Sequence, residues 1–392
     1  RRCSDIHLEP QPDRLRVRFR IDGLLRDVTS VPRSLQASVI SRVKVMSGLD
    51  VAEHRRPQDG QMHLKVGDAD IDMRVSVLPA IYGEKVVIRL LHRSARLISV
   101  DQLGFLPRAR QWVEEMLRQR QGLILVTGPT GSGKSTTLYA FLQALNVPER
   151  NIITVEDPVE YRIDGITQVQ VNPKAGLTFA SALRSVLRQD PDVVMVGEIR
   201  DAETAEIAVR AALTGHLVLS TLHTNSAAGT VVRLTDMGVE PYLLSATLIG
   251  VVAQRLVRSL CSACAELEVR ELTPAQRRFV GDAWGNHPLP VGRGCHNCEG
   301  TGYRGRIVVE EVLLVDRRIR ECLSRNPSEE EIRRLAVQAG MRTLKETGIA
   351  KVMAGRTTIE EIFQALYGLD ELEQALQPAE TAGSATGSGG RA

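Results

Sequence analysis

The residues with the clearest chemistry are those at 128–135, which read Gly-Pro-Thr-Gly-Ser-Gly-Lys-Ser. Because glycine has no Cβ atom, consecutive backbone N–H groups in this segment can turn inward around a phosphate. Lys134 would place its charge beside the β- and γ-phosphates, and the Ser135 hydroxyl would bind Mg²⁺. An apolar run at 123–126 precedes the loop. The sequence therefore predicts a P-loop that holds a nucleoside triphosphate through Gly128, Pro129, Thr130, Gly131, Ser132, Gly133, Lys134, Ser135 and Thr136.

A second chemical signal is Glu198, which follows an apolar run at 193–196. This is the Walker B arrangement, in which a buried strand brings a carboxylate to the edge of the sheet beside the P-loop. Gly197 stands where an aspartate usually precedes this glutamate, so Glu198 is the lone carboxylate at the strand end. It could orient or deprotonate water, or hold Mg²⁺ through water. The alternative is a core strand followed by a solvated acid.

Three more carboxylates, those of Glu156, Asp157 and Glu160, follow another apolar run at 152–155. Carboxylates this close together repel one another unless a cation or arginines lie nearby. They could therefore assist a metal or water network beside the phosphates, or they could form a solvated acidic loop. This segment alone favours neither interpretation.

One histidine and two arginines are further candidates for phosphate contacts. His223 follows an apolar run at 217–220, and at the end of that strand it could sense a γ-phosphate. His216, at the other end of the run, is the weaker candidate. Arg74 and Arg89 lie in alternating segments of an N-terminal module. Their forked guanidinium groups could stabilise phosphate charge from a second module, or they could pair with neighbouring acids on exposed strands.

Four of the six cysteines form two Cys-x-x-Cys pairs, which are separated by 30 residues. Each pair can hold one side of a tetrahedral Zn²⁺, and four thiolates leave no open position for chemistry. We therefore expect a structural zinc site, with a redox pair as the alternative. The expected ligands are Cys261, Cys264, Cys295 and Cys298.

The elements that must position these residues follow from the apolar periodicity. In the first module, we expect strands at 15–21, 70–77 and 85–91 and a helix at 34–46. Apolar runs at 123–126, 152–155, 193–196 and 217–220 alternate with helical patterns, which predicts a mainly parallel sheet covered on both faces. The expected domains are 1–93 (an α/β module), 94–107 (a linker), 108–254 (the nucleotide-binding core), 255–310 (the cysteine module), 311–377 (a helical region) and 378–392 (a disordered tail).

The composition excludes several other classes of protein. The chain has 392 residues, of which 43% are hydrophobic and 25% charged, and its net charge is only +3. Aromatic residues make up 4%, which gives few stacking platforms for a nucleic acid. The longest apolar stretch, near 243–253, is too short to span a bilayer. Since the chain begins at Arg1 in sequence typical of the middle of a domain, we expect an N-terminal portion to precede it.

Taken together, the motifs resemble the secretion ATPases of the type II secretion and type IV pilus superfamily, the GspE/PulE/PilB group, and most of all its type II secretion branch. The four cysteines point to the assembly branch, because retraction ATPases usually lack them. The resemblance covers nearly the whole chain. It rests on 4–10 (entry to the second N-terminal domain), 128–135 (Walker A), 153–160 (aspartate box), 190–201 (Walker B), 214–225 (histidine box) and the cysteine module.

The resemblance implies an α/β fold in which a PAS-like domain precedes a RecA-like P-loop ATPase domain with a zinc-binding insertion and a helical C-terminal region. ATP would lie between the two domains, with Arg74 and Arg89 facing its phosphates. The family further implies a homohexamer that is cytoplasmic and associated with the inner membrane through platform proteins. The domain that docks the membrane partner is expected to be missing from this chain.

The leading hypothesis is an ATPase that converts ATP hydrolysis into domain motion and so powers pseudopilus assembly in type II protein secretion. A type IV pilus assembly ATPase is the alternative within the family. Of the other classes, a RecA-like nucleic-acid motor is disfavoured by the charge and the scarce aromatics, so we expect no nucleic acid. A nucleotide-binding module that does not hydrolyse is disfavoured by Glu198.

Overall fold

The computed structural model describes residues 3–67, 69–92, 98–269, 271–281, 284 and 287–376. Residue 93, the first part of the predicted linker (94–97) and the predicted disordered tail (378–392) lie outside the described residues. The chain divides into two compact units, Arg1–Gln254 with Glu311–Met341 and Arg255–Glu310 with Arg342–Ala392.

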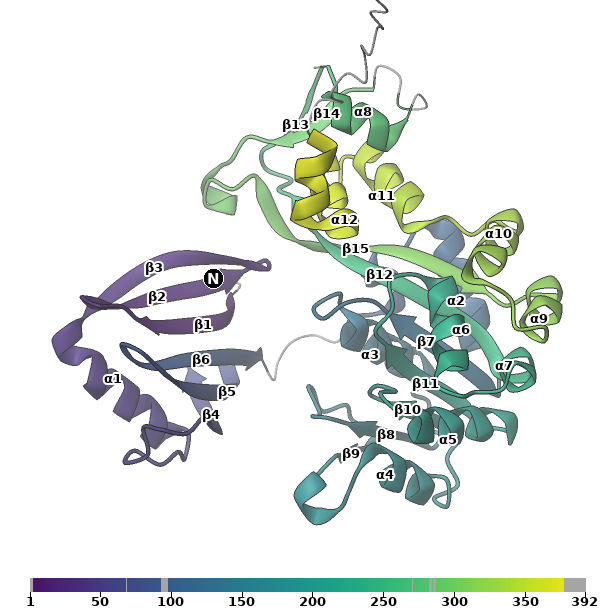
Figure 1. Ribbon diagram of the computed structural model, residues 1–392, viewed down its shortest axis with the longest axis horizontal. Coiled ribbons are helices and arrows are strands. Elements are labelled where there is room, and N and C mark those ends of the chain that lie inside the picture. Colours follow the sequence, from purple (N-terminus) through teal and green to yellow (C-terminus); the bar gives the residue numbers. More distant parts are fainter. Residues whose placement is uncertain are drawn as a thin grey trace, which may run out of the picture. The chain divides into compact units, whose positions relative to one another are not determined.

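The N-terminal part of the first unit is a six-stranded antiparallel sheet with strand order β3-β2-β1-β6-β5-β4 (Figure 1). Helix α1 (Arg33–Met46) follows β3, so the predicted helix and strands of this module are confirmed. The strands are β1 (Cys3–Pro10), β2 (Arg14–Ile21), β3 (Leu24–Pro32), β4 (Gln58–Val66), β5 (Ala69–Ala80) and β6 (Gly83–His92).

Alternation along each strand separates an apolar face from a polar face. In β2, Leu15 and Val17 are buried, while Arg16 and Arg18 point to the opposite side. Ile40 of α1 packs in the same cluster as the apolar residues of the strands, so the helix covers that face. The other face is left for charged side chains.

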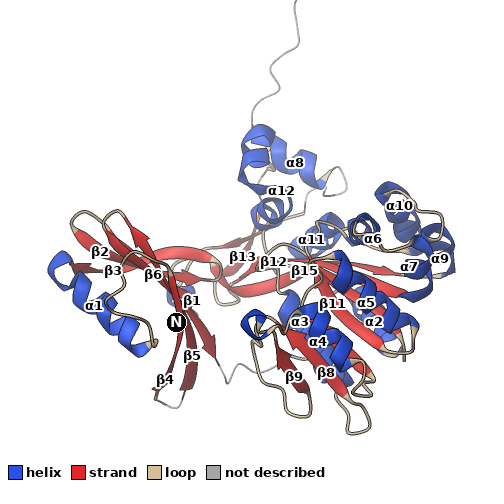
Figure 2. Cartoon of the chain, turned by 60° about the horizontal axis from the view of Figure 1, so that its bottom comes forward, coloured by secondary structure: helices blue, strands red, loops and turns tan. Residues whose placement is uncertain are grey.

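The rest of the first unit is built on a seven-stranded sheet of order β15-β12-β7-β11-β10-β8-β9. All neighbours from β12 to β9 in this order pair in parallel, which confirms the predicted parallel sheet. Figure 2 shows the strands flanked by helices. The strands are β7 (Gly122–Thr127), β8 (Ile152–Glu156), β9 (Thr167–Gln170), β10 (Val193–Val196), β11 (Leu217–Leu222), β12 (Leu248–Leu260) and β15 (Tyr303–Leu314).

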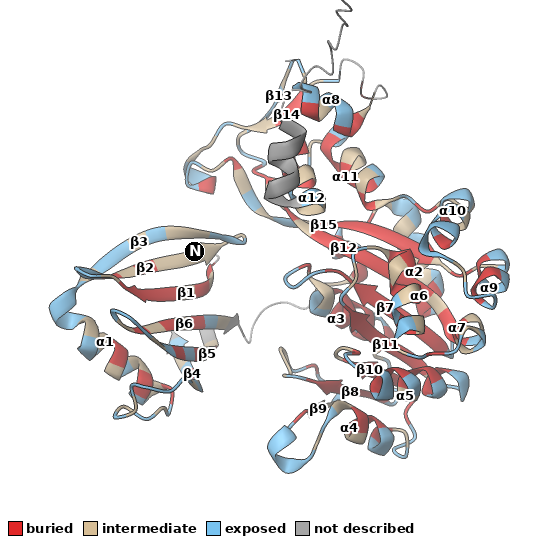
Figure 3. Cartoon of the chain, viewed as in Figure 1, coloured by how far each residue is buried: buried red, intermediate tan, exposed pale blue. Residues whose placement is uncertain are grey.

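Helices pack on both faces of this sheet. One cluster joins alternate strand residues such as Leu123 and Val194 to the helices α4 to α7, α9 and α10, whereas α3 contacts β7 and β11 and contributes nothing to that cluster. The central strands β7, β10 and β11 are buried along their whole length (Figure 3). The helices and 3₁₀ turns are η1 (Val100–Leu103), α2 (Pro107–Leu117), α3 (Lys134–Leu145), η2 (Pro173–Ala175), α4 (Phe179–Val186), α5 (Ala202–Leu213), α6 (Ala227–Asp236), α7 (Pro241–Thr247), α9 (Arg317–Leu323) and α10 (Glu329–Ala339).

The second unit has its own apolar core, which includes Phe279, Trp284, Val309, Leu344 and Ile362. The structure divides the segment 311–377 between the units, because α9 and α10 pack on α7 and α6 of the first unit whereas α11 and α12 belong to the second. The elements of the second unit are β13 (Ala265–Glu268), α8 (Pro274–Val280), β14 (Leu289–Gly292), η4 (His296–Cys298), α11 (Leu344–Met353) and α12 (Ile359–Leu376), with the distal parts of β12 and β15.

Across the described part of the chain, none of the helices combines the length and the apolar character that crossing a bilayer requires.

Candidate active site

The loop between β7 and α3 has the geometry of a phosphate cradle. Gly131 and Gly133 have φ angles of 80° and 90°, a left-handed conformation that only glycine adopts without strain. A Cβ atom at Gly128 would lie 2.4 Å from the Gln254 carbonyl oxygen. All residues of α3 are described, and no side chain caps its N-terminus, so its first N–H groups face the loop. These features fit a bound phosphate, which helix N-termini favour.

The side chains around the loop hold it in this shape. The Lys134 ammonium group donates to the carbonyl oxygens of Gly128, at 2.8 Å, and Pro129, at 3.1 Å. Gln254 Nε2 donates to the Ser132 carbonyl oxygen at 2.8 Å, and Gln254 Oε1 accepts from Thr137 Oγ1 at 2.9 Å. Sequence reasoning missed Gln254. The signal in the sequence that could have identified it is a glutamine within the apolar residues of β12, because a fully buried amide needs hydrogen-bond partners.

Glu198 and His223 lie next to Lys134. Glu198 Oε2 is 3.2 Å from His223 Nε2, and His223 Nδ1 is 3.5 Å from the Lys134 nitrogen. Arg200 forms an ion pair with Glu198 and also lies 3.8 Å from an oxygen of Asp157. The structure thus brings four of the predicted site residues, from the segments that follow four different strands, into one network that includes Arg200. Their roles in catalysis stay predictions.

A threonine cluster fixes the loop that carries His223. Thr127, at the end of β7, accepts from the Thr224 backbone N–H at 2.9 Å, and the hydroxyls of the two residues lie 2.7 Å apart. The Thr224 hydroxyl also lies 2.7 Å from that of Thr230 in α6. Since Thr127 directly precedes the P-loop, this cluster sets the position of His223 relative to the phosphate cradle.

Glu156 occupies a different environment from Glu198. It is the last residue of β8, only 4% exposed, and its carboxylate accepts from the Tyr139 hydroxyl. It also accepts from Thr154 Oγ1, at 2.6 Å, and from Gln168 Nε2, at 3.0 Å. Burial of Tyr139 and the neighbouring charge of Glu156 raise the pKa of the tyrosine hydroxyl, so it stays a donor.

The other two acids predicted in this segment lie on the loop after β8. Asp157 faces Arg200, whereas the Glu160 backbone N–H donates to the Tyr139 hydroxyl at 3.1 Å. A Glu160 carboxylate oxygen is 4.0 Å from a guanidinium nitrogen of Arg74.

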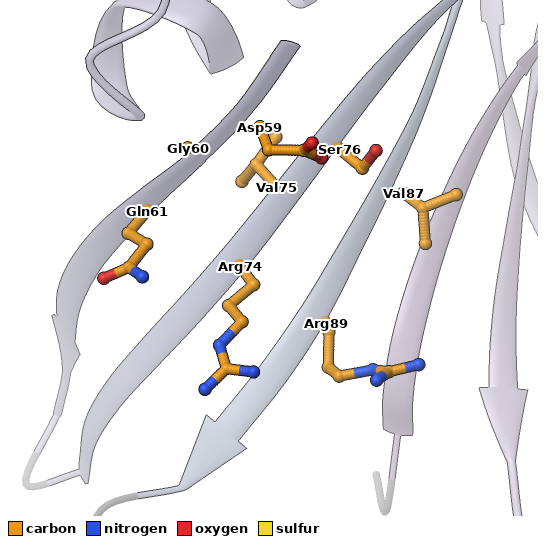
Figure 4. Close-up of a pocket in the computed structure, with 8 residues that line it drawn as sticks. All are labelled: Asp59, Gly60, Gln61, Arg74, Val75, Ser76, Val87 and Arg89. Atoms are coloured by element: carbon orange, nitrogen blue, oxygen red, sulfur yellow. The ribbon is translucent and has the colours of Figure 1, made fainter. Parts of the chain in front are cut away.

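Arg74 and Arg89 are cross-strand neighbours on β5 and β6, on the polar face of the N-terminal sheet. Figure 4 shows Gln61 beside Arg74, and the Arg89 side chain turned away from Arg74. Together with other residues of β4, β5 and β6, these three line a shallow pocket of about 380 Å³. The Arg89 Nε atom donates to the Asp5 carboxylate, on the next strand, at 3.1 Å.

Asp5 balances the positive charge of this face. Burial alone would raise the pKa of its carboxyl group, but the hydrogen bonds from Ser4 and Arg89 and the charges of Arg89 and Arg20 outweigh burial, so the pKa is lowered. Asp59 also lines the pocket, so the carboxylates of Asp59 and Asp5 offset the charges of Arg74 and Arg89. The two guanidinium groups can still donate hydrogen bonds to phosphate oxygens.

The four predicted metal ligands meet in the second unit. All four sulfur atoms lie within 4.8 Å of one another, with Cys261–Cys295 at 3.9 Å and Cys264–Cys298 and Cys295–Cys298 at 3.7 Å. These separations are too long for a disulfide, and they match the edge of about 3.8 Å expected for a tetrahedron of sulfurs around Zn²⁺. The backbone N–H groups of Cys295 and Gly302 donate to the Cys298 sulfur, which favours a thiolate. The cluster can hold a metal ion.

The chain is similar to known secretion system proteins. A family model described as "Type II/IV secretion system protein" matches residues 1–364. The chain is 52% identical over 366 residues to the type II secretion system protein E of Pectobacterium carotovorum subsp. carotovorum, which covers 93% of this chain and 72% of that protein. It is 50% identical over 363 residues to the type IV pilus assembly ATPase PilB of Thermus thermophilus, which covers 92% of this chain and 41% of that protein.

A solved structure shows the same architecture. The pilus retraction motor PilT with bound ADP aligns with 95% of this chain and 95% of its own chain, at a TM-score of 0.63 and 28% identity.

Proposed function

The chain belongs to the family of type II/IV secretion system proteins, and on that premise we propose that it hydrolyses ATP to power pseudopilus assembly in type II protein secretion. The observation that carries this proposal is the network that joins Lys134, His223 and Glu198 beside the P-loop. A triphosphate-binding loop next to a carboxylate and a histidine is what hydrolysis by water requires.

In this proposal, the P-loop N–H groups and Lys134 bind the β- and γ-phosphates. Ser135 would contribute a ligand to Mg²⁺, and a bound Mg²⁺ would neutralise phosphate charge. Glu198 orients the attacking water or takes its proton, and Asp157, Glu160 and Glu156 support the network around it. His223 responds to the γ-phosphate from its place between Lys134 and Glu198.

We further propose that residues 1–93 form the PAS-like second N-terminal domain and 108–254 the RecA-like ATPase core. Arg74 and Arg89 would contact the phosphates as these domains close over the nucleotide. Their place as cross-strand neighbours that line one pocket on the polar face supports this role. Domain closure driven by ATP is the mechanical output.

The cysteine cluster is proposed to hold a structural Zn²⁺ within a module at 255–310. Four thiolates close the coordination sphere, so the metal would stabilise this module and would take no part in hydrolysis.

We infer that the working form is a homohexamer at the cytoplasmic face of the inner membrane, bound to platform proteins of the secretion system. The identity to type II secretion proteins supports this assignment. The 50% identity to a pilus assembly ATPase favours pilus assembly as the second candidate. Complementation of two mutant strains, one defective in type II secretion and one in pilus assembly, separates the two candidates, because only the correct system is restored.

The direct test of the ATPase assignment is Lys134→Ala. Loss of the ammonium charge at the phosphates should lower ATP turnover by about 100-fold or more. The thermal midpoint should stay within a few degrees of the parental value, since the Lys134 ammonium group contacts loop carbonyl oxygens and His223 at the edge of the sheet. Phosphate release with Mg-ATP measures turnover, and parental activity in this variant would contradict the assignment.

A further inference from the structure

One buried tyrosine joins the helix of the P-loop to the acidic loop, and nothing above gives it a function. Tyr139 lies in α3, five residues after Lys134, and is 2% exposed. Its hydroxyl donates to Glu156 and accepts from the backbone N–H of Glu160 at 3.1 Å, with that of Tyr161 at 3.5 Å. A phenol has one donor hydrogen and accepts through its oxygen, so the hydroxyl is fully used.

The carboxylate that receives this hydrogen bond is held by three donors. Glu156 accepts from Tyr139, Thr154 and Gln168, all of them neutral donors. If the Glu156 carboxylate moved toward a metal ion or the nucleotide, these buried hydrogen bonds would break and their donors would lose a partner, which is costly. The geometry therefore favours a carboxylate that stays where it is.

The same network fastens the loop at 157–163. Gln168 accepts from the Ile163 backbone N–H at 2.8 Å and donates to the Tyr161 carbonyl oxygen at 2.9 Å. The ring of Tyr161 meets that of Tyr139 edge to face, with 5.8 Å between the centroids. Every one of these contacts fixes the backbone of the segment that presents Asp157 and Glu160.

We propose that Tyr139 and Glu156 are positioning residues, which couple the phosphate-binding helix α3 to the loop that carries Asp157 and Glu160. This inference rests on the proposed ATPase function. Any shift of α3 when a phosphate binds at Lys134 is passed through the Tyr139 hydroxyl to the backbone at 160 and 161. The acidic loop is thereby positioned relative to the nucleotide, while Glu156 itself does not contact the nucleotide.

The test is Tyr139→Phe, which removes one oxygen atom and keeps the ring. Because displacement of catalytic groups by about 1 Å can cost 100-fold in rate, we expect kcat for ATP to fall by about 10- to 100-fold. The P-loop is unchanged, so KM and the dissociation constant of a fluorescent ADP analogue should stay within about threefold.

A matched control is Tyr303→Phe, in the second unit, whose hydroxyl lies 3.0 Å from that of Thr358. It also loses one hydroxyl, from a half-buried tyrosine, and none of the proposed catalytic residues belongs to that unit. We expect both variants to lower the thermal midpoint similarly, but only Tyr139→Phe to lower kcat.

A double-mutant cycle identifies the route of the effect. Tyr139→Phe is combined with the loop pair Asp157→Asn and Glu160→Gln. If Tyr139 acts through the loop, its effect on kcat should shrink to less than about threefold in the loop-variant background. The proposal is overturned if the two effects multiply, if Tyr139→Phe leaves kcat unchanged, or if affinity and kcat fall together. ATP turnover by the parental chain and its loss in Lys134→Ala test the ATPase assignment separately.

Discussion

Two glutamates at the ends of neighbouring parallel strands have opposite environments. Glu156 ends β8, and Glu198 follows β10, the strand that pairs with it. Glu156 is 4% exposed and bound by neutral donors, whereas the Glu198 side chain is 18% exposed and faces Arg200 and His223. A carboxylate held by neutral buried donors keeps its partners, but one that faces exposed charged side chains can exchange them. The comparison teaches that position on the sheet edge does not by itself make an acid reactive.

Gly197 helps to explain the difference. Its backbone N–H donates to the Val155 carbonyl oxygen at 2.8 Å, and an added Cβ would lie 3.3 Å from that oxygen and 3.5 Å from the Glu156 Cα atom. A side chain here would press against β8. Glycine at 197 therefore suits this close approach to β8, and Glu198 follows one residue further on, with its side chain 18% exposed.

The largest effect should come from Glu198→Gln, which keeps the size of the side chain and removes its charge. Loss of a general base or water-orienting group lowers rates by 100- to 10,000-fold, so we expect kcat to fall by about 1,000-fold. Stability should change little, because a partly exposed ion pair contributes at most about 1 kcal/mol. Single-turnover hydrolysis and thermal unfolding measure the two quantities. A variant that unfolds readily would show that Glu198 is structural.

Glu156→Gln should show the reverse pattern. Replacing one carboxylate oxygen by an NH₂ group puts a donor against donors, so the free energy of unfolding should fall by about 1–3 kcal/mol. We expect kcat to fall only about 10-fold, through displacement of the acidic loop. Urea denaturation and steady-state kinetics are the measurements. If this variant matched Glu198→Gln, with normal stability and no turnover, Glu156 would be a direct participant and the comparison would fail.

The smallest effect is expected from Arg200→Ala. Arg200 is 58% exposed and pairs with Glu198 and Asp157, so it orients the two acids. Because these ion pairs are exposed, salt can screen them. We expect a fall of about threefold to 10-fold in kcat at low salt, since such pairs contribute at most about 1 kcal/mol. At 0.5 M salt the parental enzyme and the variant should converge. A salt-independent loss would mean that Arg200 contacts the nucleotide itself.

Much of the fold was predictable because its signals are local. The strands around 15–21 and 193–196 and the helix at 34–46 follow from apolar periodicity, and the structure confirms them. The P-loop and the two cysteine pairs are short motifs whose spacing predicts their geometry. Their residues come together as expected, while the assignment of catalytic roles stays a prediction.

The contacts that sequence reasoning missed are all long-range. Nothing near Tyr139 indicates that it meets Glu156, 17 residues away, and Gln254 reaches the P-loop across 122 residues. Likewise, the division of 311–377 between two units depends on which helices find an apolar partner. Periodicity reports which face of an element is buried, but not what covers it.

By itself, the amino-acid sequence determined that this chain has a triphosphate-binding loop, a parallel sheet that presents acids at one edge, and four thiolates spaced for a metal ion. Those properties depend on residue type and short spacing. Only the tertiary structure decided the environments of Glu156 and Glu198. Donors from α3 and β9 meet the buried Glu156 carboxylate, whereas Arg200 and His223 meet the partly exposed Glu198 carboxylate. Burial and hydrogen bonding, which arise only when distant segments pack, separate two side chains that are chemically the same.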